Sequence, residues 1–156
     1  MLKHLSKDNQ NEVFSAARLL QLTFPWTYGD KEDAHNEVLS LCQDGYITYI
    51  YVQKDTVVGI IGARPQYGMT GWELHPLAVD LDYRGQGIAT LLVEALEKDV
   101  VDHGGLVMYL GSDDEFDQTS LSKVDLFKDP FEAIKNIKNM SHHPYSFYQK
   151  CGYEIV

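Results

Sequence analysis

The N-terminal third of the chain has apolar residues spaced three and four positions apart, the period of an amphipathic helix. One such pattern begins after Asp8 or Asn9, either of which can cap a helix, and runs to about Leu22. A second begins at Asp30 and runs to about Cys42, with acids in its first turn, where the helix dipole favours them. A short strand is expected over residues 1–5.

The middle of the chain alternates between apolar and polar residues, as strands do. Residues 46–53 and 57–64 are predicted to form a hairpin around the turn 54–56, and residues 65–71 to connect it to a central strand. That strand, residues 72–79, is expected to direct alternate side chains to opposite faces. One face would carry Glu73, His75, Leu77 and Val79, and the other Trp72, Leu74 and Ala78.

The C-terminal half begins with a helix from Ile88 to about His103, which Gly104-Gly105 would end. Residues 106–110 are expected to form a buried strand parallel to the central one. Residues 118–139 resemble an insertion with a short helix at 130–137. A helix with Pro144 in its first turn follows, and residues 154–156 are expected to begin a strand.

Size and charge limit the classes of function. With 156 residues the chain is expected to be a single domain, 1–156. It has no apolar run of ~20 residues and no signal peptide, and its two cysteines fit a reduced cytoplasm, so a cytoplasmic protein is predicted. A net charge of −10 argues against binding nucleic acid or a membrane and is compatible with a cationic substrate.

A strand, a glycine-bearing turn and a helix start follow one another around Gly85 and Gly87. The backbone N–H groups at a helix start lack internal partners, and the helix dipole is positive there, so this arrangement suits a phosphate. It is not a P-loop, because no Gly-Lys-Ser/Thr follows. It is not the dinucleotide fingerprint, because the third glycine is absent.

The pattern Arg84-x-x-Gly87-x-Ala89 resembles the pyrophosphate-binding signature of the GNAT acetyltransferases, which bind acetyl-CoA. The residues that this resemblance assigns to acetyl-CoA are Leu77, Ala78, Val79, Arg84, Gly85, Gln86, Gly87, Ile88, Ala89 and Thr90. The segment 144–153 resembles the second signature of the family, in which a tyrosine protonates the departing thiolate. Tyr148 matches that tyrosine.

The whole chain resembles the bacterial aminoglycoside 6′-N-acetyltransferases, notably over residues 65–68, 71–77, 109–114 and 143–148. The resemblance implies an α/β (α+β) GNAT fold, a mixed and mostly antiparallel sheet with helices on both faces. It also implies a homodimer and direct transfer of acetyl to an amine. Glu73 matches the acid or base at the acceptor, and Leu77 the residue whose N–H holds the thioester carbonyl.

Acetyl transfer to an ammonium first requires loss of a proton. Glu73 and His75, about 7 Å apart along one face of the predicted strand, are the candidates for this role, and Glu73 is favoured. No covalent intermediate is required, and no HExxH or Cys/His cluster points to a metal.

Several residues are candidates for binding the acceptor amine, and most of them have two interpretations. Phe24 and Trp26 lie in a loop that is either pinned to the core by its rings or one wall of an acceptor pocket. Asp113 and Asp114 open an acidic loop that either attracts amines or is simply solvated. Tyr67, just before the central strand, is a further candidate.

Two departures from the relatives affect these expectations. Phe24 stands where the relatives carry tryptophan, and the relatives continue with further strands after the position of Val156. An open edge on the strand 106–110 is therefore expected, with weaker catalysis. Either a partner chain covers this edge, which is favoured, or the insertion 118–139 folds over it, or the protein is poorly stable. The alternatives are transfer to another amine, such as a polyamine or a protein amino group, and a catalytically impaired CoA-binding protein.

Overall fold

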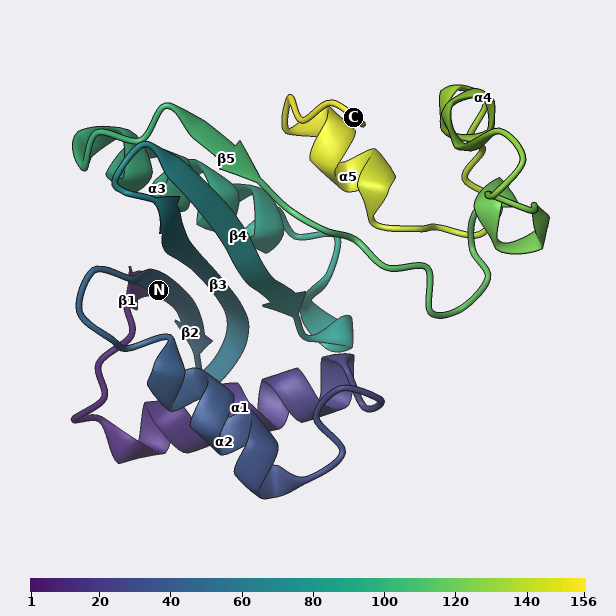
Figure 1. The fold of residues 1–156 in the computed structure, drawn as a ribbon. Coiled ribbons are helices and arrows are strands. Elements are labelled where there is room, and N and C mark those ends of the chain that lie inside the picture. Colours follow the sequence, from purple (N-terminus) through teal and green to yellow (C-terminus); the bar gives the residue numbers. More distant parts are fainter. The chain divides into compact units, whose positions relative to one another are not determined.

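A five-stranded sheet in the order β1-β2-β3-β4-β5 forms the centre of the computed structural model, which describes residues 1–156 (Figure 1). The first four strands are antiparallel neighbours, and β5 is parallel to β4. The strands are β1 (Leu2–His4), β2 (Ile47–Gln53), β3 (Thr56–Tyr67), β4 (Gly71–Val79) and β5 (Val107–Tyr109).

The chain divides into two compact units, Met1–Leu110 and Gly111–Val156. The first contains the whole sheet with helices α1 (Gln10–Thr23), α2 (Lys31–Ser40) and α3 (Ile88–Asp102), and the short 3₁₀ helix η1 (Leu81–Tyr83). The second contains η2 (Ser120–Lys123), α4 (Pro130–Lys135) and α5 (Tyr145–Lys150). None of the helices combines the length and the apolar composition needed to cross a lipid bilayer.

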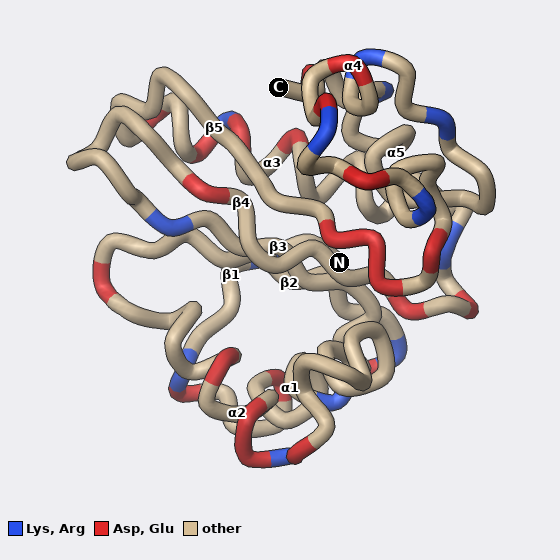
Figure 2. Tube along the Cα trace, turned by 45° about the vertical axis from the view of Figure 1, so that its right-hand side comes forward, with Lys and Arg blue, Asp and Glu red and all other residues tan.

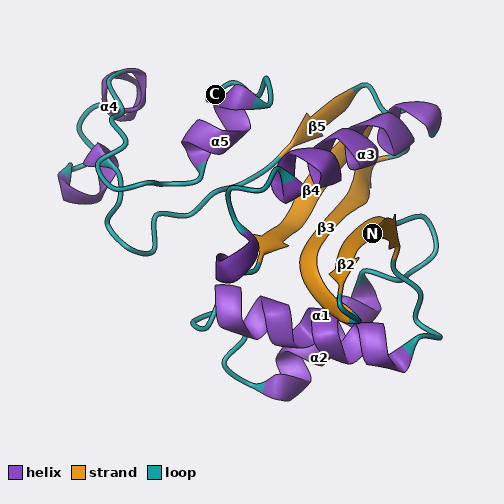
Figure 3. Ribbon diagram, turned by 180° about the vertical axis from the view of Figure 1, so that it is seen from behind, coloured by secondary structure: helices purple, strands orange, loops and turns teal.

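Helices cover both faces of the sheet, as the resemblance to the GNAT acetyltransferases implied. The buried side chains of α1 and α2 form one core with Ile50, Ile60 and Ala78. Position 59 faces the other way, because a Cβ there would lie 3.0 Å from side-chain atoms of Ile88 and Leu92. Helix α3 accordingly lies behind the sheet in Figure 1 and in front of it in Figure 3.

Local signals set several of these boundaries. The side chains of Asn9 and Asp30 cap α1 and α2 by accepting hydrogen bonds from backbone N–H groups two or three residues later. Lys54 and Asp55 have φ values of 49° and 58°, which a two-residue hairpin of type I′ requires. Both helices and the hairpin were predicted.

The predicted connection over residues 65–71 is wrong in its first half. Strand β3 continues to Tyr67, with Pro65 opposite Trp72 and Tyr67 opposite Gly71. Proline lacks only its N–H, and an antiparallel ladder uses alternate residues on each side, so the strand continues through Pro65. Hence the hairpin connection between β3 and β4 is only residues 68–70.

A β-bulge interrupts β4 and reverses its faces. Ile61 pairs with Leu77 and Ala63 with Leu74, so Gly62 alone lies opposite two residues, 75 and 76. Side chains directly opposite each other share a face. Val79, opposite Gly59, therefore faces α3, as does Leu77, whereas His75 contacts Glu37 of α2.

The predicted alternation along the central strand is therefore wrong beyond the bulge. Glu73 and His75 do share a face, but Leu77 and Val79 lie on the opposite one, and Ala78 joins the core beneath α1. A period-two pattern cannot reveal an inserted residue, because the insertion shows only in the pairing with the neighbouring strand.

The last strand, β5, is not buried as predicted. It has only three residues, and Leu106 and Val107 are 81% and 61% exposed. It pairs with β4 over Gly71–Glu73 and has no strand on its other side. An apolar run predicts a buried strand only when layers cover both of its faces.

The second unit is a set of short helices tied by side-chain hydrogen bonds. Asn139 bonds to the backbone carbonyl of His143 and to the hydroxyl of Ser146. Helices α4 and α5 correspond to the predicted ones, and Gly152 follows α5 with a φ of +97°. The strand expected at residues 154–156 is absent, because the segment pairs with no other strand.

Candidate active site

Strand β4 has an open edge over its second half. Its pairing with β5 ends at Glu73, so residues 74–79 have a strand partner only in β3. The N–H of Asp80 donates to the carbonyl of Val58 in β3 at 2.9 Å. Because successive N–H groups point to opposite sides of a strand, those of Leu77 and Val79 point to the open edge.

The loop after β4 is held in place by its own polar groups. Asp80 accepts a hydrogen bond from the N–H of Asp82, and Nε of Arg84 donates to the carbonyl of Val79 at 3.0 Å. Gln86 donates back to the carbonyl of Asp82. These contacts fix the loop as it leaves the open edge of β4.

Two glycines then carry the chain into α3. Gly85 and Gly87 have φ values of +73° and +80°, a region that glycine adopts without strain, and a Cβ at either would meet no atom within 4 Å. Gly87 is the N-cap of α3 and supplies no side chain. The N–H groups of Ile88, Ala89 and Thr90 therefore have no partner in the protein.

The residues predicted to bind acetyl-CoA therefore lie along one stretch of backbone in the first unit, with the side chains of Ala78, Val79 and Ile88 buried. It begins with the outward N–H groups at the end of β4 and ends at the uncapped start of α3. Free N–H groups and a helix dipole suit an anionic pyrophosphate, and the open space around the glycines lets it approach the backbone.

Glu73 is held by two neighbours on the same sheet. Nε of Arg64 and Nε2 of Gln66 donate to its Oε2 at 2.8 Å and 3.1 Å. Oε1 accepts no hydrogen bond within the protein and remains available to a bound cation. The carboxylate raises the pKa of Arg64 above its ordinary value, chiefly through this hydrogen bond.

His75 lies on the same face as Glu73 and contacts a residue that sequence reasoning missed. Its Nε2 is 3.1 Å from Oε1 of Glu37, which lies on α2, thirty-eight positions earlier. The hydrogen bond to His75 holds the pKa of Glu37 below its usual value, despite partial burial. One feature of the sequence could have indicated Glu37. It is an acid of α2 that lies beyond the first turn, where the helix dipole does not explain the presence of a carboxylate.

The aromatic candidates separate into two kinds. Phe24 packs on the core of α1 and α2, with its ring 6.3 Å from that of Tyr28, which supports the pinned-loop interpretation for this residue. Burial and then the charge of Glu37 raise the pKa of Tyr28 to about 12. Trp26 and Tyr67 are 78% and 73% exposed, so their rings are not pinned to the core. A role for them in binding the acceptor stays a prediction.

The remaining candidates lie in the second unit. Tyr148 of α5 is half-buried, its ring packs against Phe147 and Tyr153, and burial raises its pKa to about 12. The hydroxyl is therefore fully protonated at neutral pH, as a proton donor must be.

The acidic loop that follows β5 appears as red segments in Figure 2. Asp114 is engaged within it, accepting hydrogen bonds from both the N–H and the hydroxyl of Thr119 and from the N–H of Gln118. Burial opposes these bonds, but together they lower the pKa of Asp114. Asp113 accepts through its backbone carbonyl from His143. A structural role for Asp114 is thus visible, and substrate contact by either residue stays a prediction.

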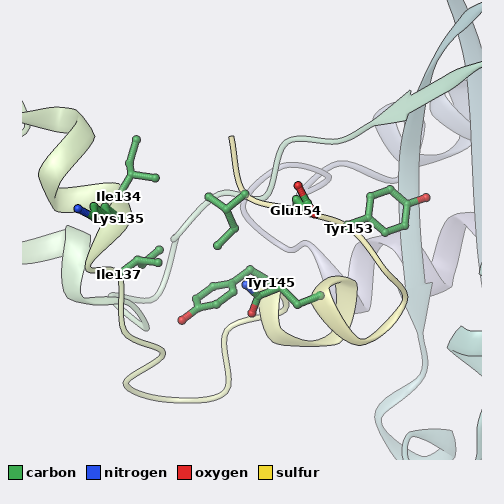
Figure 4. Close-up of a pocket in the computed structure, with 8 residues that line it drawn as sticks. Ile134, Lys135, Ile137, Tyr145, Tyr153 and Glu154 are labelled. Carbon is green, nitrogen blue, oxygen red and sulfur yellow. The ribbon is translucent and has the colours of Figure 1, made fainter.

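One hollow lies entirely within the second unit (Figure 4). It has a volume of about 550 Å³ and contains none of the predicted site residues. Its lining residues are Ile134, Lys135, Ile137, Tyr145, Gln149, Tyr153, Glu154 and Ile155.

Comparison with known proteins agrees with this architecture. The profile of the acetyltransferase (GNAT) family matches residues 14–122. A solved aminoglycoside 6′-N-acetyltransferase complexed with coenzyme A is 42% identical, with a TM-score of 0.94 over 100% of this chain and 86% of its own. The aminoglycoside 6′-N-acetyltransferase from Enterococcus faecium has the same identity and coverage, with a TM-score of 0.91.

A third solved structure, an aminoglycoside 6′-acetyltransferase of type Ii, is 37% identical over 100% of this chain and 84% of its own, with a TM-score of 0.77. No curated protein sequence matches the chain. The family profile spans most of the first unit, including the open edge of β4, the glycine loop and α3. The chain belongs to the GNAT acetyltransferase family.

Proposed function

We propose that this protein transfers acetyl from acetyl-CoA directly to the 6′-amine of an aminoglycoside. The observation that carries the proposal is the likeness, over the full chain, to a solved aminoglycoside 6′-N-acetyltransferase complexed with coenzyme A. The open edge of β4, the glycine loop and the paired carboxylate of Glu73 supply the chemistry that such a reaction requires.

The donor binds along the stretch of backbone described above. The pyrophosphate of acetyl-CoA accepts hydrogen bonds from the N–H groups of Gly87, Ile88 and the next residues of α3. The outward N–H of Leu77 donates to the thioester carbonyl, and it donates more strongly as that oxygen gains negative charge in the tetrahedral intermediate.

The acceptor binds through its ammonium groups, one of them to the available oxygen of Glu73. Once one amine has lost a proton, its nitrogen attacks the thioester carbon to give a tetrahedral intermediate. That nitrogen then loses its second proton to water, and the C–S bond breaks as the carbonyl re-forms. The departing thiolate takes a proton from the hydroxyl of Tyr148, which regains one from solvent. No bond to the protein forms at any step.

We also infer that the protein forms a homodimer, the assembly that its resemblance to the aminoglycoside acetyltransferases implies. The exposed apolar side chains of Leu106, just before β5, and of Val107 on it support an interface at this strand, since an open apolar edge favours association. Sedimentation at micromolar concentration tests this, with a stable monomer as the contrary result.

The function is tested by measuring thiol release from acetyl-CoA with a panel of amines. Kanamycin and tobramycin are expected to be acetylated at the 6′ position, which mass spectrometry of the product identifies. Turnover confined to a polyamine or a protein amino group would replace the proposed acceptor. CoA binding without turnover on any amine would make the chain a binding protein only.

A further inference from the structure

The contact between Glu37 and His75 joins a helix to the strand that carries the acceptor carboxylate. Glu37 lies on α2, and Oε1 of its side chain is 3.1 Å from Nε2 of His75 on β4. The two side chains are 25% and 38% exposed, so the pair is partly withdrawn from water and open to it on one side. Figure 2 shows the acids of α2 in red.

The chemistry of the two groups fixes which imidazole nitrogen carries the proton. An ionised carboxylate only accepts hydrogen bonds, so Nε2 of His75 must donate in this contact. In the neutral ring Nδ1 is then the unprotonated nitrogen, and no group of the protein bonds to it. The result is a base nitrogen whose orientation is set by a carboxylate, the relation found in many catalytic dyads.

Glu73, by contrast, is poorly arranged to be the base. Its Oε2 already accepts from Arg64 and Gln66, and the guanidinium is an ion-pair partner at 2.8 Å. Its other oxygen is left to hold the acceptor ammonium through a charge-assisted hydrogen bond, a binding role that assigns proton removal to another group. The charged or titratable groups around the Glu37–His75 pair are Tyr28, Arg64 and Glu73.

We propose that Glu37 is a positioning residue for acetyl transfer, holding His75 so that Nδ1 accepts, through water, the proton lost by the acceptor ammonium. The inference rests on the proposed function and assigns the deprotonation step to one site. The ammonium N–H bond breaks, Nδ1 gains the proton, and the imidazolium remains paired with Glu37 until it returns the proton to solvent. Glu73 keeps the acceptor in place during this step.

The kinetic test compares Glu37→Gln, His75→Gln and the double variant. A positioned general base increases the reaction rate about 10²–10⁴-fold. Removing the anion that orients the base should remove part of this increase. We expect Glu37→Gln to lower kcat about tenfold, with the KM of the aminoglycoside changed less than about twofold. In the His75→Gln background the same change should have almost no effect, because coupled residues are not additive. Glu37→Asp should recover part of the loss.

Glu32→Gln is the matched control, because it removes the same charge from an exposed position of α2. Thermal melting establishes that each variant is folded. Independent losses in Glu37→Gln and His75→Gln that multiply in the double variant would overturn the inference. So would a Glu37→Gln protein with wild-type kcat.

A second measurement does not depend on turnover. Nitrogen NMR of the histidine rings, at a pH where the imidazole is neutral, distinguishes the two tautomers. His75 should carry its proton on Nε2 in the wild type and show a mixture in Glu37→Gln. A proton on Nδ1 in the wild type would reject the inference even in an active enzyme. Inactivity on every amine with the expected tautomer would reject the proposed function and, with it, this assignment of the proton.

Discussion

Nε of Arg64 lies 2.8 Å from Oε2 of Glu73, directly across the β3–β4 ladder. The pair leaves one carboxylate oxygen unbonded within the protein, which is why Glu73 is assigned to the acceptor. We expect Glu73→Gln to raise the KM of an aminoglycoside by about 10–100-fold, since a hydrogen bond to a charged group is worth about 1.5–3 kcal/mol. Its CoA affinity should remain that of the wild type.

Glu94→Gln is the control for this variant, because Glu94 is exposed on α3. Steady-state kinetics and calorimetry with CoA measure the two affinities. An aminoglycoside KM equal to that of the wild type would show that the acceptor binds elsewhere.

Gly87 is expected to be essential for CoA binding. Its φ of +80° lies in a region that β-branched residues rarely adopt, at a cost of about 1–2 kcal/mol. The two methyl groups of Gly87→Val would also occupy space that the pyrophosphate needs. Calorimetry should show that the affinity for CoA is lowered by at least about fivefold. This corresponds to a loss of roughly 1 kcal/mol of binding free energy, since ~1.4 kcal/mol is a tenfold change.

Gly104→Val is the matched control, because Gly104 has a similar φ of +87° at the opposite end of α3. It is expected to lose stability without losing CoA affinity. Equal losses of affinity in the two variants would indicate damage to the helix and not to the ligand site.

Replacing the tyrosine hydroxyl on α5 should reduce the rate moderately. Solvent can protonate a thiolate, so Tyr148→Phe is expected to lower kcat less than a base variant does, about threefold to tenfold within the range for general acids. Because the pKa of Tyr148 is about 12, its hydroxyl stays protonated throughout the usual assay range. The wild-type rate should therefore show no decline from this group below about pH 11. A decline near pH 9 that disappears in Tyr148→Phe would contradict the assignment.

Gly62 should be the glycine of the sheet that tolerates substitution least. An added Cβ would lie 2.6 Å from the backbone oxygen of His75 and 3.2 Å from a methyl group of Leu41. Gly62→Ala is expected to cost about 1–3 kcal/mol of the free energy of unfolding. Urea denaturation measures the loss. Gly111→Ala, where a Cβ meets nothing within 4 Å, is the control, and equal stabilities would disprove the close packing at the bulge.

Acceptor binding should weaken in salt. The net charge of −10 and the acids at Asp113, Asp114, Glu115 and Asp117 motivate this expectation. Raising the ionic strength from about 0.1 M to about 1 M shortens the Debye length from ~10 Å to ~3 Å. The KM of an aminoglycoside should rise severalfold over this range, with a smaller change for a monoamine. A salt-independent KM would show that net charge does not contribute to binding.

Much of the first unit was predictable because its signals are local. The cap at Asn9, the hairpin at Lys54-Asp55 and the glycines around α3 each act within a few residues, so the sequence contains the whole cause. The positive φ values of Gly85 and Gly87 are local in the same way, whereas the binding of CoA by their loop stays a prediction. The family profile over residues 14–122 confirms the predicted fold class.

The errors concern contacts between distant residues. The face of Leu77 depends on an insertion visible only against Gly62, and the contact of Glu37 with His75 joins a helix to a strand 38 residues later. The exposure of Leu106 depends on whether another layer covers β5, which its own apolar residues do not determine. The pattern of apolar and polar residues along a chain does not reveal contacts between residues that are distant in the sequence.

The bulge in β4 has a consequence for how such a protein can change. Because residues 75 and 76 together lie opposite Gly62, the strand presents Glu73 and His75 to one helical layer and Leu77 to the other. Under the proposed mechanism, substitutions on the α2 side can therefore alter which amine is selected without displacing the N–H of Leu77. Acceptor preference and donor binding become separately adjustable traits on one continuous strand.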